Sequence, residues 1–589
     1  MNGCANTGSP SGGPKDETPP RLIKSIPAMY ELNYKKDKVE IFFDELISVE
    51  KASEKVIVSP PQLLSPTVKA VGKKVSVVFL DSLIDNTTYT IDFTDAIVDY
   101  NEKNKFGDYA FSFSTGSNID SLRVGGVLLD ASNLNPVSGA IIGVHKNLHD
   151  TVFTKKGFSS ISKTSQDGFF SVKGLSKDSF RVYALGDKNR DYKFDQPGEP
   201  IAFCDSIVYP WTEPCLKSDT IWKDSITVDS IWTRTVTCYK PDDVVLLYFY
   251  EDFGRQYLAK KERASREKIA LTFGYKSETL PKLKLIDYPS GNWYLPEVNL
   301  TKDTLLYWIT DTSVISMDTL RIELGYFKTD STNQLAPALD TLTLVSRKIP
   351  KKNPRKDSKK KDGEVPVEPV FPLEVEVSIK GSMDIYDVPI IRWETPIKEI
   401  KGNPWHLYKK SGSNLVDIPF KVEKDSLKIR EFNLKAKWEF GENYRFEIDS
   451  GMITGLYGKT NEKFTSDFKI FNEEEYSRLI LTVAGINGSA FVELLNKTDD
   501  VVRKEKIVDN VADFKYLKPG TYFMRAIEDL NGNFKWDTGN YAKKKQPERV
   551  YYNQKSVELR KNWDNEEEWD VKSVPVELQK PKELIPKTK

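Results

Sequence analysis

The stretch YTIDF at residues 89–93 alternates apolar and polar side chains, which is the period of a β-strand with one buried face. The same alternation occurs in VEIFF at residues 39–43 and in VSVVF at residues 75–79. Turn-forming Gly, Pro, Asn and Asp recur at intervals of roughly 8 to 14 residues, a spacing typical of β-sandwiches. Helical periodicity is limited to residues 257–269 and 472–476. The sequence therefore predicts an all-β protein, a multidomain string of β-sandwiches.

The composition excludes several classes of function. The 589-residue chain carries 86 Lys plus Arg and 86 Asp plus Glu, so it has no net charge that would attract nucleic acid. Three His and four Cys leave few ligands or bases for zinc, haem, iron–sulfur or His-dependent nucleophilic chemistry. No run of about 18 apolar residues is present, so no membrane-spanning helix is expected. We therefore predict a protein that is not an enzyme and does not bind nucleic acid.

The first residues suggest a tether. Residues 1–17 are rich in Gly, Ser and Pro, a composition that cannot bury a core. Gly3 and Cys4 fit the end of a bacterial lipoprotein signal whose basic and apolar parts are missing here. A lipid on Cys4 would anchor the chain to a membrane, whereas the alternative is a chance Cys near the N-terminus.

Residues 18–116 contain a specific order of motifs. These are SIP at 25–27, IFFDE at 41–45, NTTYTIDF at 86–93 and FSFSTG at 111–116. Their order resembles that of the bacterial Ig-like domain family first associated with surface-layer proteins. The resemblance implies a β-sandwich whose inward-facing anchors are Phe43, Tyr89, Ile91, Phe93, Phe111 and Phe113.

Residues 117–209 follow a different pattern. The stretch TSQDGFFSV at 164–172 is followed by FRVYAL at 180–185, and Gly168 would supply the positive φ of a hairpin turn. This pattern resembles the small β-sandwich of carboxypeptidase-regulatory-like domains, a structural module. The resemblance implies no catalytic residues.

An internal repeat organises the chain. FRVYALGDKNRDYKFD at 180–195 and YFMRAIEDLNGNFKWD at 522–537 place acidic and amide residues at the same offsets after an alternating strand. Residues 444–448 and 464–470 likewise echo 89–93 and 109–113. The predicted division is: tether 1–17, Ig-like domain 18–116, regulatory-like sandwich 117–209, connector with Cys and Trp 210–240, extra β-sandwich 241–346, basic and Pro-rich linker 347–372, second Ig-like domain 373–476, second regulatory-like sandwich 477–570 and polar tail 571–589.

The repeated loops are candidate calcium sites. In the first, the oxygen-bearing side chains are Asp187, Asn189, Asp191, Asp195 and Glu199, and in the second they are Asp529, Asn531, Asn533 and Asp537. Calcium takes six to eight oxygen ligands, and the first spacing resembles a calcium loop. An EF-hand would have Gly and Glu where this chain has Tyr192 and Gly198, so an Asx-rich turn that satisfies its own backbone amides is the alternative. Bound Ca²⁺ would make the loop rigid rather than perform catalysis.

Two further groups of residues have plain interpretations. Cys204, Cys215 and Cys238 lie close together in sequence, and in an oxidising compartment two of the three could pair; the sequence does not decide which. His145 and His149 would share a metal-binding face only on a helix. The preceding residues predict a strand, so we interpret both as surface residues of a hairpin.

Both ends of the chain carry further motifs. CANTGSPSGGPKD opens it at residues 4–16, and PGTY at 519–522 and NFKWDTGNY at 533–541 lie toward its end. These motifs resemble a family of Gram-negative Ig-like outer-membrane lipoproteins, which implies an exported lipoprotein in the outer membrane, at the cell surface or on the periplasmic face.

The function expected from this resemblance is that of a non-catalytic scaffold. Its partner would be an outer-membrane protein complex, with barrel assembly or export machinery as candidates. The alternative is a cell-surface adhesin or glycan-binding protein, in which exposed Trp and Tyr would stack on sugar rings.

Overall fold

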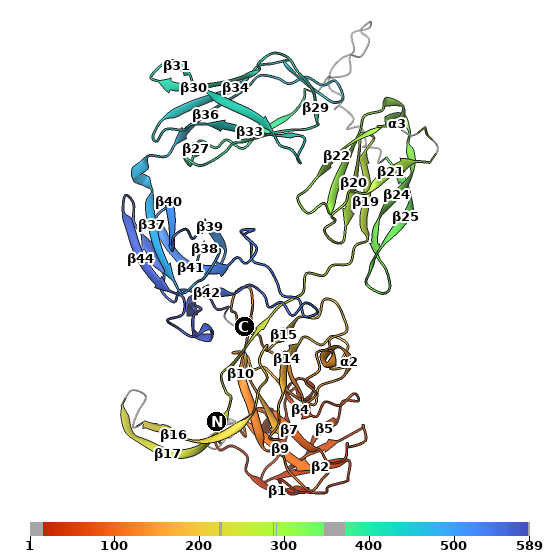
Figure 1. The fold of residues 1–589 in the computed structure, drawn as a ribbon, viewed down its shortest axis with the longest axis vertical. Helices are drawn as coiled ribbons and strands as arrows, with labels where there is room; N and C mark the ends of the chain where they lie inside the picture. The colour runs from red at the N-terminus through yellow and green to blue at the C-terminus, as the bar shows by residue number, and fades with distance from the viewer. Residues whose placement is uncertain (1–15, 223–226, 287, 290, 347–371, 587–589) are drawn as a thin grey trace, which may run out of the picture.

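The computed structural model describes residues 16–222, 227–286, 288–289, 291–346 and 372–586. These residues form five β-sandwich domains, shown in Figure 1. We number them domain 1 (16–116), domain 2 (122–250), domain 3 (258–345), domain 4 (373–470) and domain 5 (477–586). The predicted all-β, multidomain fold class is confirmed.

Domain 1 is a sandwich with an aromatic core. All six anchors predicted from the sequence are buried between its sheets, because each lies on the inward side of an alternating strand. Its elements are a sheet in the order β1 (Leu22–Ile26), β2 (Lys38–Phe43), β6 (Lys74–Val78), β5 (Thr67–Val71), a sheet in the order β4 (Ile57–Ser59), β7 (Thr88–Thr94), β9 (Tyr109–Ser114), the pair β3 (Ile47–Val49) and β8 (Ile97–Asp99), and the short helix α1 (Ala52–Lys55).

Domain 4 repeats the topology of domain 1. Its first sheet has the same order, its second sheet keeps the corresponding strands with one added at each edge, and the short pair is present. Its elements are β26 (Val375–Val377), β28 (Ile390–Trp393), β33 (Glu431–Ala436), β32 (Phe420–Lys424); β27 (Ser382–Met383), β36 (Phe464–Ile470), β34 (Asn443–Ile448), β30 (Trp405–Ser411), β31 (Asn414–Asp417); and β29 (Ile397–Ile400) with β35 (Ile453–Gly455).

Domain 3 has the same strand order without the short pair, so it is a third copy of this sandwich. Its elements are β19 (Leu258–Ser265), β20 (Lys268–Phe273), β23 (Thr304–Ile309), β22 (Tyr294–Val298); β21 (Lys282–Leu285), β24 (Thr319–Thr329), β25 (Leu335–Val345); and the helix α3 (Thr312–Ser316). The prediction of a helix at residues 257–269 was wrong. Ile269, Leu271 and Phe273 alternate into the core, so the segment is a hairpin of two strands.

Domains 2 and 5 share a second topology. In each, the first strand is central, pairs antiparallel on one side and parallel on the other, and a second sheet covers it. Domain 2 has β13 (Phe169–Leu175), β10 (Leu122–Asp130), β18 (Val244–Tyr248); β12 (Ser160–Lys163), β11 (Ile141–His145), β14 (Arg181–Leu185), β15 (Ile201–Phe203); and the helix α2 (Val152–Lys155). This agreement in strand order supports the predicted repeat.

Domain 5 has the corresponding elements in the same order, with one short 3₁₀ turn, η1, just before its first strand and two more after its last strand. They are β40 (Val511–Leu517), β37 (Ser477–Ala484), β44 (Asp564–Asp570); β39 (Val501–Lys506), β38 (Ala490–Leu495), β41 (Gly520–Glu528), β42 (Val550–Tyr552), with β43 (Val557–Leu559) paired to β41; and the turns η1 (Glu473–Glu475), η2 (Val576–Leu578) and η3 (Lys582–Leu584). The helical pattern expected at residues 472–476 contains only the single turn η1.

Two features of domain 2 differ from the predicted division. Residues 210–240, expected as a connector, contain the long hairpin β16 (Trp211–Trp222) and β17 (Val228–Lys240). The strand β18, assigned from the sequence to the following domain, returns to domain 2 and pairs in parallel with β10. Parallel partners can be far apart in the chain, so local alternation could not reveal this pairing.

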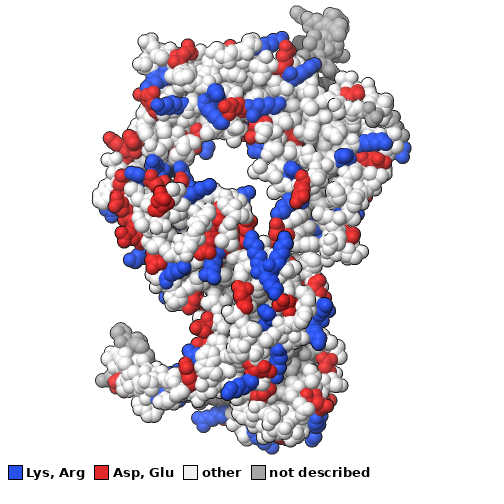
Figure 2. All heavy atoms as spheres, in the orientation of Figure 1, with Lys and Arg blue, Asp and Glu red and all other residues white. Residues whose placement is uncertain are grey.

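The domains do not follow one another in an open line. Domain 5 returns to domain 2, and their contact has its own apolar core of Val127, Leu129, Phe491, Phe523 and Ile527. The space-filling view in Figure 2 shows an opening bordered by domains 3, 4 and 5. The contact between the two repeated modules therefore closes the chain into a ring.

Candidate functional site

The two candidate calcium loops start in the same way, just after β14 and β41. The Asp187 carboxylate accepts the backbone N–H groups of Arg190 at 2.6 Å and Tyr192 at 3.0 Å. The Asp529 carboxylate accepts those of Asn533 at 3.0 Å and Phe534 at 2.9 Å. Each loop is therefore organised by its first aspartate, whose carboxylate binds backbone amides three to five residues further on.

A buried glutamate closes each loop. Glu199, 1% exposed, accepts the backbone N–H of Lys188 at 2.9 Å. In the second loop Glu548 accepts the N–H of Leu530 at 2.8 Å and that of Asp537 at 2.9 Å. Glu548 was not predicted from the sequence. It lies 18 residues after Leu530, whose amide it binds, whereas Glu199 lies only 11 residues after Lys188. The signal in the sequence that points to it is the Asp that follows an alternating strand in both repeats.

The remaining polar side chains of the first loop bind one another. The Asn189 amide donates to Asp191 Oδ2 at 3.0 Å and to Asp195 Oδ1 at 3.2 Å. The Lys193 ammonium lies 3.2 Å and 3.4 Å from the same two carboxylates. In the second loop, Asn531 and Asn533 both donate to Asp537. Within the described ranges, no three His, Cys, Asp or Glu side chains are grouped as ligands of one metal ion. Both loops thus have the arrangement expected for Asx-rich turns, and calcium binding stays a prediction.

One atom of the first loop is left without a partner. Glu199 Oε2 is buried and accepts no hydrogen bond from the described part of the chain. Burial raises the pKa of Glu199, and the nearby charges of Asp187 and Asp195 raise it further. A cation that reached this oxygen would relieve both effects, and this is the feature that favours the calcium prediction.

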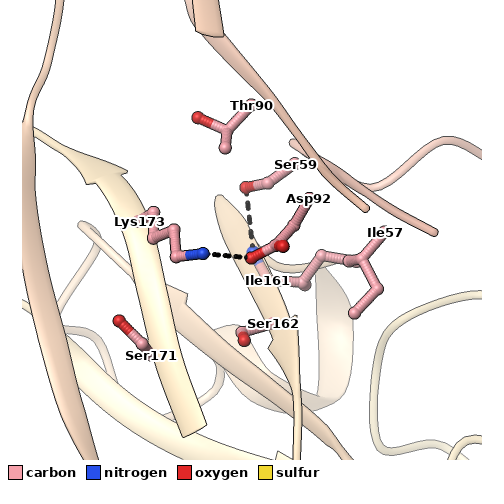
Figure 3. Close-up of a pocket in the computed structure, with 8 residues that line it drawn as sticks. All are labelled: Ile57, Ser59, Thr90, Asp92, Ile161, Ser162, Ser171 and Lys173. Carbon is pink, nitrogen blue, oxygen red and sulfur yellow. Dashed lines mark hydrogen bonds and ion pairs between the residues drawn. The ribbon is translucent and has the colours of Figure 1, made fainter. Parts of the chain in front are cut away.

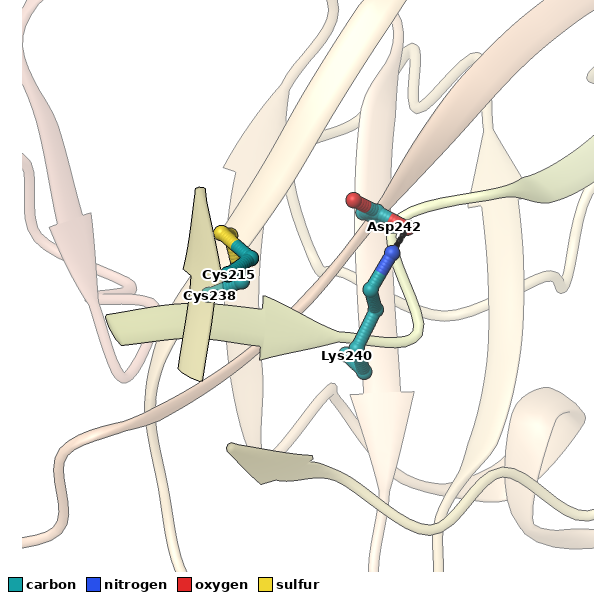
Figure 4. Close-up of a disulfide and its surroundings, with 4 residues drawn as sticks. All are labelled: Cys215, Cys238, Lys240 and Asp242. Carbon is teal, nitrogen blue, oxygen red and sulfur yellow. Dashed lines mark hydrogen bonds and ion pairs between the residues drawn. A yellow bond between two sulfur atoms is a disulfide. The ribbon is translucent and has the colours of Figure 1, made fainter. Parts of the chain in front are cut away.

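The hairpin β16–β17, which we call the arm (residues 211–240), is held by a disulfide. Cys215 pairs with Cys238 across its two strands, close to the Lys240–Asp242 ion pair of 2.8 Å (Figure 4). Cys204 is the free thiol in this region, and burial raises its pKa. The structure thereby selects one of the pairings that the sequence left open.

Large apolar side chains of the arm face solvent. Leu216 is 75% exposed, Trp232 69% and Ile231 64%. The strand register places Leu216 and Ile231 on one face and Trp232 on the other. Figure 1 shows the arm projecting away from domain 2. These three side chains are not covered by the rest of the described chain.

Domains 1 and 2 are joined by a tight seam (Figure 3). The Lys173 ammonium lies 2.5 Å from Asp92 Oδ2, and the backbone N–H of Ile161 donates to Ser59 Oγ at 3.1 Å. The cavity between them is about 10 Å³, room for no more than one water molecule. The seam therefore fixes the two domains against each other rather than binding a ligand.

Two predicted features lie outside the described residues. They are Cys4, the proposed lipidation site, and the basic linker.

His145 was predicted at the surface but is buried in β11 against Phe158 and Tyr183. It lies on the face of β11 turned away from β10, which is covered by an aromatic cluster that includes Phe153 of α2 and Phe158, so the surface prediction was wrong. None of the helices in the described part of the chain has the length and apolar character that a membrane span requires.

Comparison with known proteins supports the assignment of domain 1. Residues 16–115 match the family described as bacterial Ig-like domain. Ig-like folds serve typically as structural and binding modules. The match covers one domain of five, and no curated protein sequence matches the chain.

Solved structures show only remote similarity. The N-terminal part of the bacterial S-layer protein SbsC is 16% identical with a TM-score of 0.12, covering 28% of this chain and 40% of that one. Domains 1–6 of the surface layer protein SbsC are 10% identical with a TM-score of 0.13, covering 87% and 62%. The Bacillus anthracis TIE protein is 11% identical with a TM-score of 0.11, covering 95% and 76%. The chain thus spans less than two thirds of the first two, and no conclusion rests on these likenesses.

Proposed function

We propose that this protein is a non-catalytic outer-membrane lipoprotein, anchored through Cys4, that acts as a scaffold or accessory subunit of an envelope protein complex. The observation that carries the proposal is the arm, a projecting β-hairpin with uncovered apolar side chains on both faces. The Ig-like domain supports a structural role, and the resemblance of the two chain ends to outer-membrane lipoproteins supports the location.

The arm has the properties of a protein-binding element. An isolated two-stranded hairpin is marginally stable in water, and exposed apolar patches on soluble proteins mark interaction sites. Burying Leu216, Ile231 or Trp232 in a partner would contribute about 1.5–3 kcal/mol each. The Cys215–Cys238 disulfide restrains the hairpin, so less conformational entropy is lost on binding.

The rest of the chain supplies a rigid support. The domain 2–domain 5 core and the seam between domains 1 and 2 limit hinge motion at the base of the arm. The Arg123 guanidinium also stacks 4.5 Å from the ring centre of Tyr239 and fixes β17 to β10. A scaffold needs this rigidity, because a docking element on a flexible base would not position its partner.

The test is an affinity purification from mild detergent, with Leu216→Asp and Trp232→Ser as arm variants. Leu300→Asp, at an exposed apolar residue of domain 3, is the matched control. We expect envelope proteins to co-purify with the native chain and the control, and to be lost from the arm variants. Equal recovery from all four chains would contradict a docking role for the arm. Subunits of barrel assembly or export machinery among the recovered proteins would identify the complex.

A further inference from the structure

A large groove lies between domains 1 and 2, beside the seam. Its volume is about 880 Å³, which falls within the range of small-ligand sites, and domain junctions are frequent places for such sites. Its floor is aliphatic and already packed, since Ile57, Val58, Ile161 and Leu185 are all buried. The floor therefore offers no pocket for an apolar side chain of a ligand.

Two cations, Lys163 and Arg190, line this groove, and the Asp187 carboxylate beside them accepts the backbone N–H of Arg190 rather than its guanidinium. Lys163, at the end of β12, donates to the Glu54 carbonyl oxygen at 3.1 Å, and Arg190 lies on the first repeated loop. Across the described ranges, neither has a carboxylate within ion-pair distance. Burial lowers the pKa of Lys163 and the charge of Arg190 lowers it further, while the Glu54 carboxylate opposes this shift without reversing it. An anionic group placed between them would remove this repulsion.

The backbone at Arg190 has a conformation that favours glycine. Arg190 has φ of 63°, in the left-handed region where a Cβ contacts the neighbouring carbonyl oxygen. The equivalent residue of the second loop, also three positions after the first aspartate, is Gly532 with φ of 73°. The first copy of the module thus keeps an arginine at a position where its own repeat has glycine. The arginine kept at this position places a guanidinium at the groove wall.

Tyrosines line the same groove. Tyr192 and Tyr248 are partly buried, and Tyr250 is 60% exposed. A tyrosine presents an apolar ring face together with a hydroxyl group, the combination that suits the face and the hydroxyls of a sugar ring.

From these contacts we propose that the groove binds an acidic oligosaccharide, with its carboxylate or sulfate group on Lys163 and Arg190 and its sugar rings against the tyrosines. A peptide is the less suitable occupant, because the packed floor has no pocket for apolar side chains. This ligand site is separate from the arm and goes beyond the scaffold role, so either proposal can fail without the other.

The experiment is calorimetric titration of the purified chain with four probes: a sulfated heparin tetrasaccharide, tetragalacturonate, neutral cellotetraose and a decaglutamate peptide. We expect at least one acidic oligosaccharide to bind, with an affinity that falls as salt rises, and the other two probes to bind at least tenfold more weakly. The two acidic probes distinguish sulfate from carboxylate recognition. No binding by either, equal binding of cellotetraose, or equal binding of decaglutamate would overturn the proposal.

The variants are Arg190→Gly and Lys163→Met. Arg190→Gly installs the residue of the second repeat, so we expect the affinity to fall at least tenfold while the thermal midpoint does not decrease. Lys302→Gly is the matched control, since Lys302 is another left-handed cation but lies in domain 3. Unchanged affinity in both groove variants, or an equal loss in the control, would refute the assignment.

Discussion

Arg430 of domain 4 donates from Nε to Glu297 Oε2 of domain 3 at 2.8 Å, and the Trp308 indole donates to the same oxygen at 2.8 Å. Glu297 is buried, and the Arg430 guanidinium also stacks over the Trp308 ring at 5.3 Å. This ion pair joins two domains that are connected in sequence only through the linker, so it is one of the contacts that set the shape of the ring.

Arg430→Ala should weaken the contact between domains 3 and 4, leaving the Tyr457 hydrogen bonds to the Glu267 and Ile309 carbonyl oxygens. Removing one partner of a buried ion pair leaves the other charge without compensation and costs about 3–5 kcal/mol. Small-angle scattering should show a larger radius of gyration than in the native chain. Arg445→Ala is the control, because the Arg445–Asp467 pair of 2.7 Å lies at the surface of domain 4 and should contribute about 0–1 kcal/mol. Identical scattering from both variants would disprove this role for Glu297.

Replacing both Cys215 and Cys238 by Ser should loosen the arm without unfolding the domains. The disulfide spans 23 residues, for which the chain-entropy estimate is about 3 kcal/mol of stabilisation, and this acts on the hairpin alone. Limited proteolysis should cut within residues 211–240 faster, while the thermal midpoint stays unchanged. Cys204→Ser should alter neither quantity. An unchanged rate of cleavage in the double variant would show that the arm is rigid without its disulfide.

Cys4→Ser should release the protein from membranes if a lipid on Cys4 is its anchor. Two or three acyl chains give stable attachment, and their loss leaves only weak surface contacts. The measurement is the distribution of the protein between membrane and soluble fractions. Cys204→Ser is the control and should stay with the membranes. Retention of the Cys4 variant there would mean that another contact anchors the chain.

Calcium should raise the thermal midpoint of the chain if the first loop binds it. At a concentration a hundred times the dissociation constant, binding stabilises the folded state by about 2.7 kcal/mol. Glu199→Gln should abolish the shift, because it removes the charge of the carboxylate whose Oε2 has no partner. Glu548→Gln should retain it, because both oxygens of Glu548 already accept backbone N–H groups. No shift at millimolar calcium would favour the Asx-turn interpretation.

Domain 2 should lose stability on acidification through His145. Burial lowers the pKa of His145 from 6.5 to about 4, and the side chain is 2% exposed. The unfolded chain therefore binds a proton that the folded chain does not, and stability is full above pH 6.5 and falls as the pH approaches 4. The shift corresponds to a loss of about 3 kcal/mol in the free energy of unfolding.

Denaturant titrations at pH 7 and pH 4.5 would measure this loss. His145→Phe should reduce the pH dependence, since the new ring would pack against Phe158 and Tyr183 without titrating. His149→Gln should leave it unchanged, because His149 is exposed. A pH dependence unaltered by His145→Phe would assign the effect to other groups.

The sequence alone determined the fold class and the repeated modules. Alternation in stretches such as YTIDF decides which side chains face inward, and it identified all six anchors of domain 1. The strand–Asp motif of residues 180–195 and 522–537 indicated two copies of one module, and their sheets have the same order. These properties are local, because a period of two depends only on the pleat of a strand.

Tertiary structure decided what local pattern could not. Domain 3 has the topology of domain 1 without its motifs, β18 returns to domain 2 beyond the arm, and His145 is covered by aromatic side chains of α2 and the loop that follows it. The closure of domain 5 onto domain 2 and the groove beside Arg190 depend in the same way on residues far apart in the chain. An alternating strand specifies that one face will be buried but not which surface covers it, so these relationships are set only when the domains pack.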